Sequence, residues 1–279
     1  AGTAWIGLYY AQQRLALARD SLDSLRDFVP VAVSAVASGS ARPAESLAIR
    51  RELLEIEDAI TRIEAARAAA RARLQRYIAG SEPVAAGGAP QVTVDPEELR
   101  FALEANPELR LADAEQRRAE AAADLARAEK RPDFGVSVTY GHRNPDFGSV
   151  ISVMGSVTLP IFTDRRQNPR IAAAEADAAA ASAERVDRLR AIRARFETDL
   201  AEWRSALQQW ERARDQLLPL ARDRADLETA SFAAGRADLV EVIAAKSALA
   251  LLELEILERE QMAVEAAATL RLTYGEDRP

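Results

Sequence analysis

Apolar residues recur every three or four positions along most of the chain, the spacing that places them on one face of an α-helix. This pattern predicts helices over 2–37, over 43 to about 78, over about 170–229 and over 239–272. Pro219 predicts a kink or a break in the third helix. The second and fourth helices have the spacing typical of a coiled-coil seam. Their seam positions are Ile49, Leu53, Ile56, Ile60, Ile63, Ala70 and Leu74, and Val242, Leu249, Leu252, Ile256, Ala263, Ala266 and Leu270.

Residues 132–162 show a period of two instead, which predicts two β-strands joined by a turn at 144–149. Apolar residues alternate there with small polar ones. The apolar positions are Val136, Val138, Tyr140, Ile151, Val153, Val157, Leu159 and Ile161. Because an isolated two-stranded hairpin is only marginally stable in water, we expect these strands to pair with strands of other chains.

Turn and cap signals divide the chain further. Asp95-Pro96 and Asn106-Pro107 each combine an N-cap residue with a proline in the first helical turn. We expect five parts: a first helical hairpin at 1–79 with its tip turn near 38–43, a Gly/Pro-rich linker at 80–94, helices at 95–131, the β-hairpin at 132–162, and a second long helical hairpin at 163–279 with its tip turn near 231–238.

The second half of the chain repeats part of the first. Residues 39–74 align with residues 235–270 without a gap, and Glu45 and Glu241 each follow an aligned glycine by six residues. Such self-similarity predicts two equivalent helix–turn–helix units. The second unit follows a β-hairpin, whereas the chain begins directly in helical periodicity, without an initiator Met or a signal peptide. We therefore expect that a preceding strand pair is missing.

Composition excludes several classes of function. The net charge is −7 with both signs interspersed, which argues against a nucleic-acid partner. The absence of cysteine excludes disulfides, Cys-ligated zinc and thiol catalysis. His142 is the only histidine, so we expect no metal site. Neither a phosphate-binding loop nor a catalytic triad is present, and we expect neither an enzyme nor a cofactor.

Four segments carry a resemblance to a known family: RPDFGVSVTYG, SVTLPIF, ASGSARPAESLAIR and FAAGRADLVEVIAAK. Their order, together with the repeat, resembles the outer-membrane factor (TolC-like) family of efflux ducts. The LPIF segment, its polar loop and IAAAEADAAAA are similar in style to the heavy-metal (CzcC/CusC-like) branch. The resemblance covers essentially the whole chain. The chain corresponds to the part of a family member that follows its first pair of strands.

The resemblance implies a mainly α fold, in which long antiparallel helices form part of a periplasmic tunnel. The β-hairpin would contribute to a trimeric transmembrane β-barrel in the Gram-negative outer membrane, with outer-membrane lipid around it. The chain would be a passive duct for metal ions or small toxic compounds. Its partners would be two further copies in a homotrimer, a periplasmic adaptor protein and an inner-membrane RND-type transporter that supplies the energy.

The resemblance also implies roles for the two tip turns and for the strands. The pore constriction is expected at Glu45, Glu241, Phe232 and Asp238. The adaptor is expected to dock on Gly39, Ser40, Ala41, Arg42, Gly235, Arg236, Ala237 and Leu239. The apolar strand positions given above are expected to face lipid. Rings of carboxylates repeated by symmetry favour cations, but both glutamates are equally explained as first-turn acids that complement a helix dipole.

The sequence leaves two other functions open. A periplasmic adaptor also has a long helical hairpin, but its β-rich segments lie on both sides of that hairpin, whereas helices flank one β-hairpin here. A structural coiled-coil protein would leave the alternating strands and the 196-residue repeat unexplained.

Overall fold

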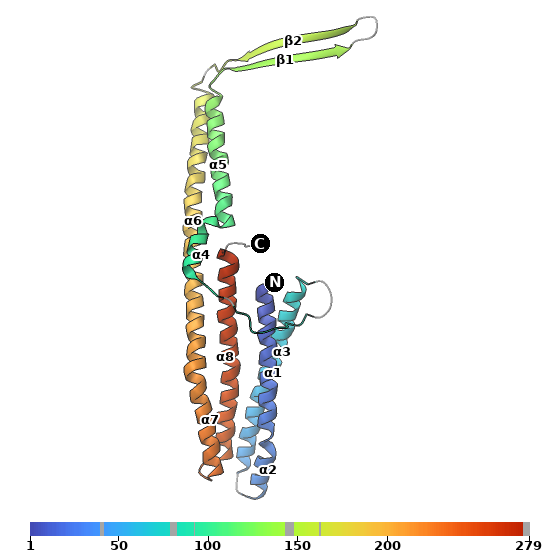
Figure 1. Cartoon of the computed structure of the whole chain (residues 1–279), viewed down its shortest axis with the longest axis vertical. Coiled ribbons are helices and arrows are strands. Elements are labelled where there is room, and N and C mark those ends of the chain that lie inside the picture. Colours follow the sequence, from blue (N-terminus) through green and yellow to red (C-terminus); the bar gives the residue numbers. More distant parts are fainter. Residues whose placement is uncertain (40–41, 79–82, 92, 143–147, 162, 276–279) are drawn as a thin grey trace. The chain divides into compact units, whose positions relative to one another are not determined.

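The computed structural model describes residues 1–279 except 40–41, 79–82, 92, 143–147, 162 and 276–279. The described residues are mostly helical and include one antiparallel β-hairpin, which confirms the predicted mainly α fold class (Figure 1). The elements are α1 (Gly2–Arg26), α2 (Val29–Ala37), α3 (Pro43–Gln75), α4 (Pro96–Ala102), a 3₁₀ turn (Leu103–Ala105), α5 (Pro107–Ala128), β1 (Asp133–His142), β2 (Ser149–Thr158), α6 (Gln167–Arg212), a π-helical segment (Ala213–Leu217), α7 (Leu218–Ala233) and α8 (Leu239–Tyr274).

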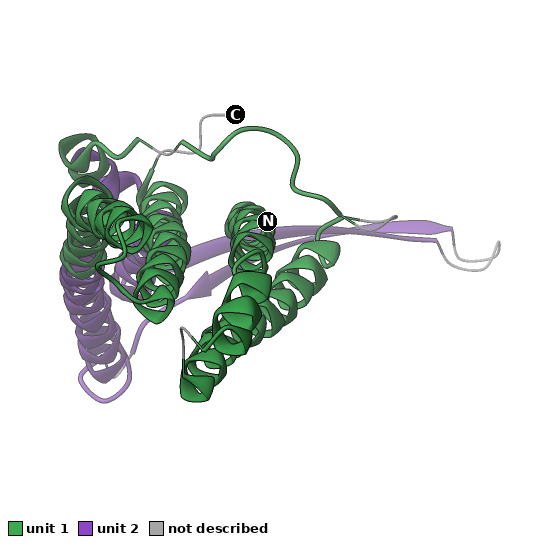
Figure 2. Ribbon diagram, turned by 90° about the horizontal axis from the view of Figure 1, so that it is seen from below, with its two compact units in different colours: residues 1–100, 196–279 green, residues 101–195 purple. Residues whose placement is uncertain are grey.

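The chain divides into two compact units, coloured separately in Figure 2. Unit 1 contains residues 1–100 and 196–279, and unit 2 contains residues 101–195. None of the helices formed by the described residues is long and apolar enough to cross a membrane.

Unit 1 is a bundle in which α1 packs against both α3 and α8, and α7 lies along α8. The predicted seams provide part of its core. Ile49, Ile56 and Ile63 of α3 are buried, as are Val242 and Leu270 of α8. Other seam positions are only half-buried: Leu53, Ile60, Leu249, Leu252 and Ala266. One apolar cluster joins the two helical hairpins near their turns. Its buried members are Leu22, Leu25, Ala32, Ile49, Ile56, Leu239, Ile243 and Ala250.

Two predicted helices are interrupted. The prediction of one helix over 2–37 is wrong, because α1 ends at Arg26 and α2 begins at Val29. Pro30, in the first turn of α2, has no N–H, and its ring would clash with the carbonyl of Arg26 in a continuous helix. The kink or break predicted at Pro219 takes the form of a change in helix type: α6 passes into a π-helical segment, the backbone stays helical, and Pro219 lies in the first turn of α7.

The repeat is visible in the backbone. Helix α3 begins at Pro43 and α8 begins at Leu239, which keeps the offset of 196 residues. The aligned glycines Gly39 and Gly235 both have positive φ, of 76° and 67°. Because residues with a Cβ rarely adopt this conformation, each glycine ends the preceding helix and lets the chain reverse into the next one.

Unit 2 contains the strands and the two helix segments that lead into and out of them. Ion pairs connect its helices, including Arg185–Asp113 and Arg127–Glu175. Asp95 and Asn106 each cap the N-terminus of the next helix, as predicted. The side chain of Asn106 accepts a hydrogen bond from the Glu108 N–H at 2.9 Å, and that of Asp95 accepts one from the Glu97 N–H at 2.9 Å.

The β-hairpin has a register in which Val138 is opposite Val153 and Tyr140 is opposite Ile151. Directly opposed residues of antiparallel strands share a face, so the predicted apolar positions from 136 to 157 lie together on one face. The prediction that the second strand continues through Leu159 and Ile161 is wrong, because β2 ends at Thr158. Pro160 cannot donate to a strand ladder, and the Ile161 N–H donates to the Leu159 carbonyl instead.

Candidate functional site

The two turns predicted to carry the site lie at the same end of unit 1 (Figure 1). Phe232 packs, half-buried, against the apolar cluster that joins the hairpins, and Leu239 is a buried member of it with 7% exposure. Ala237 is half-buried. The exposed turn residues are Gly39, Arg42, Gly235, Arg236 and Asp238. Ser40 and Ala41 lie outside the described residues. The fold therefore brings the two turns together and offers a polar, exposed end above an apolar base.

The first turn is held by a contact between its arginine and its acid. Arg42 Nε donates a hydrogen bond to Glu45 Oε1 at 3.2 Å, and the Glu45 N–H donates to the Arg42 carbonyl oxygen at 2.9 Å. Glu45 thus lies in the first turn of α3, where a carboxylate is favoured by the helix dipole.

The second turn uses its equivalent acid differently. Glu241 belongs to a capping box with Asp238, and its Oε2 accepts a hydrogen bond from the Asp238 N–H at 3.2 Å. Both glutamates therefore stabilise the start of their own helix. This geometry supports the explanation that both acids stabilise the first turn of a helix. Their role at a pore constriction stays a prediction.

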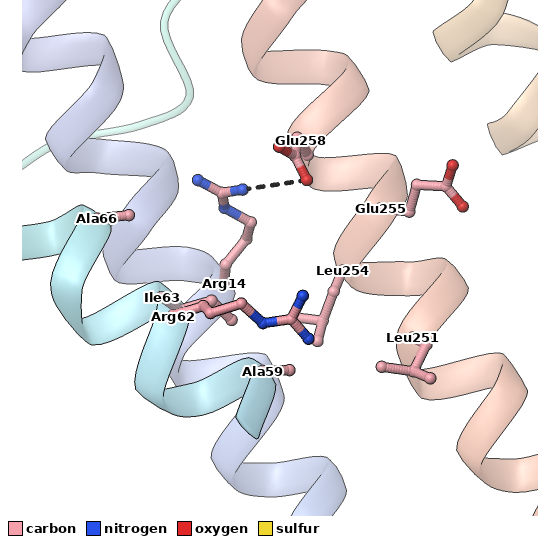
Figure 3. Close-up of a pocket in the computed structure, with 9 residues that line it drawn as sticks. All are labelled: Arg14, Ala59, Arg62, Ile63, Ala66, Leu251, Leu254, Glu255 and Glu258. Atoms are coloured by element: carbon pink, nitrogen blue, oxygen red, sulfur yellow. Dashed lines mark ion pairs between the residues drawn. The ribbon is translucent and has the colours of Figure 1, made fainter. Parts of the chain in front are cut away.

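A groove of about 390 Å³ runs between α1, α3 and α8 in unit 1 (Figure 3). Ile63 of α3 and Leu251 and Leu254 of α8 line it. Arg14 of α1 points toward α8, with Nη1 3.5 Å from Glu258 Oε2 and Nη2 donating to Gln261 Oε1 at 3.1 Å. These contacts attach α1 to α8.

The apolar face of the β-hairpin is exposed along its whole described length. Val136 is 77% exposed and Val138 is 68% exposed, and the residues opposite them on β2 are exposed as well. His142 lies at the end of β1, where its Nδ1 is 3.1 Å from Ser149 Oγ. Among the described residues, no group of three or more potential ligands is placed to hold a metal ion.

The hydrophobic periodicity of the sequence did not indicate one polar cluster. Tyr10 of α1 is buried and lies beside Glu260 of α8, and burial raises the pKa of both side chains. The positive charge of Arg214, in the π-helical segment, partly offsets the increase for Glu260. Arg214 also lies over the Trp210 ring, 4.5 Å from its centroid. Arg214 and Glu260 lie on different helical elements, so the periodicity of a single helix did not indicate that they are close.

Comparison with known proteins shows to which family the chain belongs. The family model described as outer membrane efflux protein matches residues 99–276, more than half of the chain. The chain belongs to the outer membrane efflux protein family. The match includes the β-hairpin and the second of the two tip turns. A search of curated proteins found no relative of significant similarity.

Solved structures show the same fold as this efflux-family chain. A membrane protein from Pseudomonas aeruginosa is 19% identical, with a TM-score of 0.84 over 98% of this chain and 64% of its own. CusC is 16% identical, with a TM-score of 0.85 over 98% of this chain and 67% of its own. The open-state MtrE outer membrane channel of Neisseria gonorrhoeae is 18% identical, with a TM-score of 0.77 over 98% and 64%. The chain spans about two thirds of the length of these proteins.

Proposed function

We propose that this chain is part of the protomer of an outer-membrane exit duct in a tripartite efflux system. The main support for this proposal is that the chain belongs to the outer membrane efflux protein family. MtrE is named as an outer membrane channel and CusC is described as forming a transmembrane channel. In this proposal three copies pair their strands into a barrel in the Gram-negative outer membrane, and their helices form a tunnel in the periplasm.

The hairpin supports the membrane part of the proposal. Its exposed apolar face, with Val136, Val138 and Val153, has the character of a lipid-facing surface. The opposite face carries Ser137, Thr139, Ser152, Ser156 and Thr158, which would line the lumen. Leu159 and Ile161 follow the strand and would lie at the edge of the membrane.

The shared end of the two turns supports the periplasmic part of the proposal. An adaptor protein would dock on the exposed residues around Gly39 and Gly235. Glu45, Glu241 and Asp238 would be repeated three times around the axis, which favours the passage of cations. Phe232 would attach the second turn to the apolar cluster that joins the two helical hairpins.

The proposed cargo is metal ions or small toxic compounds, and the energy comes from an inner-membrane RND-type pump. The style of the LPIF loop and the following Ala-rich helix favours the heavy-metal branch. A strain that lacks the gene should lose tolerance to divalent metal salts more than to organic toxins. A larger loss for the organic compounds would contradict the metal assignment and leave the duct proposal intact.

The duct itself is tested with the full-length protein. We expect it to fractionate with the outer membrane, to cross-link as a trimer in detergent, and to conduct ions when reconstituted into planar lipid bilayers. A monomer that fractionates away from the outer membrane, without conductance, would overturn the proposal. The same fractionation distinguishes the duct hypothesis from the adaptor hypothesis, because a periplasmic adaptor would not need lipid to cover the apolar face of the hairpin.

A further inference from the structure

Basic residues are frequent in the two segments that connect the helices of unit 2 to the β-hairpin. We call Lys130, Arg131, Arg165, Arg166 and Arg170 the root patch. Three acids lie in the same two short segments, at 129–133 and 163–170, so basic residues outnumber acids by five to three in a chain whose net charge is −7. A pocket of about 760 Å³ opens here, and its charged lining residues are Arg131, Arg166 and Arg170 together with Glu129 and Asp133.

Two arginines of the root patch are available to a ligand. Arg170 Nη1 is 3.2 Å from Glu129 Oε2, so these two charges neutralise each other. Asp164 accepts a hydrogen bond from Asn168 at 2.7 Å. Arg131 and Arg166 are exposed, and among the described residues neither side chain has an ion-pair partner.

The same pocket has an apolar side. Leu125, Leu159 and Ile161 line it and are each more than 60% exposed. Leu159 directly follows β2, and Phe134, at the near end of β1, belongs to the apolar face of the hairpin. Unpaired guanidinium groups therefore lie beside exposed apolar side chains, and the apolar surface continues along the strands. A ligand that matches both parts has an anionic head and a hydrocarbon body.

We propose that this pocket binds the headgroup of an anionic phospholipid. Arg131 and Arg166 donate hydrogen bonds to the phosphate oxygens, and Leu159 and Ile161 contact the first methylenes of the acyl chains. Guanidinium groups suit this role because their planar donors match phosphate oxygens, and basic residues next to a membrane-embedded segment attract anionic lipid. The inference rests on the proposed function, in which the hairpin is embedded in the outer membrane.

The test measures phosphatidylglycerol binding to the detergent-purified, full-length protein by native mass spectrometry. The variant is Arg131→Ala/Arg166→Ala, and its matched control is Arg118→Ala/Arg188→Ala, which removes two exposed arginines from α5 and α6 away from the pocket. We expect the dissociation constant to rise roughly 10- to 30-fold in the first variant, since each basic residue near a membrane surface contributes about a fivefold factor. The control should bind as the wild type does.

A third variant, Arg131→Lys/Arg166→Lys, separates lipid recognition from folding. It keeps both charges, and we expect binding intermediate between wild type and the alanine variant because lysine lacks the planar fork. Phosphatidylcholine should bind all variants equally weakly. Equal phosphatidylglycerol binding by wild type and the alanine variant would overturn the inference. That result leaves the duct proposal intact, whereas absence of the trimer and of conductance in any lipid would overturn the duct proposal itself.

Discussion

The bundle of unit 1 and the β-hairpin of unit 2 contain similar apolar side chains in opposite situations. Ile56 of α3 is completely buried by other residues of the same chain, whereas Val136 of β1 is 77% exposed. Burial of a large aliphatic side chain contributes about 1.5–3 kcal/mol to stability. The bundle obtains this stabilisation from contacts within the chain, whereas the apolar face of the hairpin does not. The difference indicates that the helices fold against each other, whereas the hairpin face needs a surface outside the chain.

The backbone of the hairpin leads to the same conclusion. Strands β1 and β2 pair only with each other among the described residues, so the outer edge of each strand has unpaired N–H and C=O groups. Such edges pair readily with further strands, and in lipid every backbone group must be paired. In the proposed duct, neighbouring strands satisfy the edges and lipid covers the apolar face.

The largest expected effect comes from placing a charge on the apolar face. Val138→Arg should prevent assembly into the outer membrane, because an arginine facing lipid near the middle of the bilayer costs about 2–4 kcal/mol. Thr139→Arg is the matched control on the opposite face, next along the same strand. The measurement is the amount of trimer in the outer-membrane fraction. Equal loss in the two variants would contradict the assignment of the lipid-facing side.

The second prediction concerns the buried side of the comparison. Ile56→Ala should lower the free energy of unfolding of the helical bundle by about 2–5 kcal/mol, because it leaves a cavity in the cluster that joins both hairpins. Leu54→Ala, an exposed position two residues away in α3, should change it by no more than about 0.5 kcal/mol. Thermal unfolding followed by circular dichroism measures both. Similar losses would show that the cluster does not stabilise the bundle.

The third prediction compares the two turns within the bundle. Glu241→Ala should lower stability by about 1 kcal/mol, because the Asp238 N–H loses its capping acceptor. Glu241→Gln should retain most of that stability, since an amide oxygen also accepts. Glu45→Ala should cost less, because the Arg42 side chain that it pairs with is highly exposed. Chemical denaturation of the three variants gives the ranking, and a loss for Glu241→Gln equal to that for Glu241→Ala would identify the charge itself as the stabilising feature.

Much of this fold could be predicted from the sequence because its periods are long and regular. The helical seams, the strand alternation, the caps at Asp95 and Asn106 and the repeat at Gly39 and Gly235 are local patterns, and each corresponds to a feature of the structure. The break at Pro30 was missed because the apolar spacing continues across it, although the missing N–H of proline was a usable signal. The strand was predicted too long for a similar reason, since Leu159 and Ile161 keep the alternation across Pro160.

The candidate site was only partly predictable. The turns could be located from the two glycines, but the hydrogen bonds of Glu45 and Glu241 depend on the side chains that the backbone places beside them. The contact of Arg214 with Trp210 joins residues four apart, a spacing that a helix places side by side, whereas the effect of Arg214 on Glu260 depends on how separate helical elements pack. Distant pairs such as Tyr10 and Glu260 come together only when α1 packs on α8.

The smallest expected effect tests that polar cluster in the bundle. Burial raises the pKa of Glu260 above its ordinary value of 4.5, so the folded protein retains a proton that the unfolded chain releases. The free energy of unfolding should therefore fall as the pH rises from 4.5 through the raised pKa, and then level off. Glu260→Gln should flatten this dependence and be the more stable protein at neutral pH. Denaturation curves at several pH values measure the slopes, and an unchanged slope in Glu260→Gln would show that Glu260 is ionised at the same pH in both states.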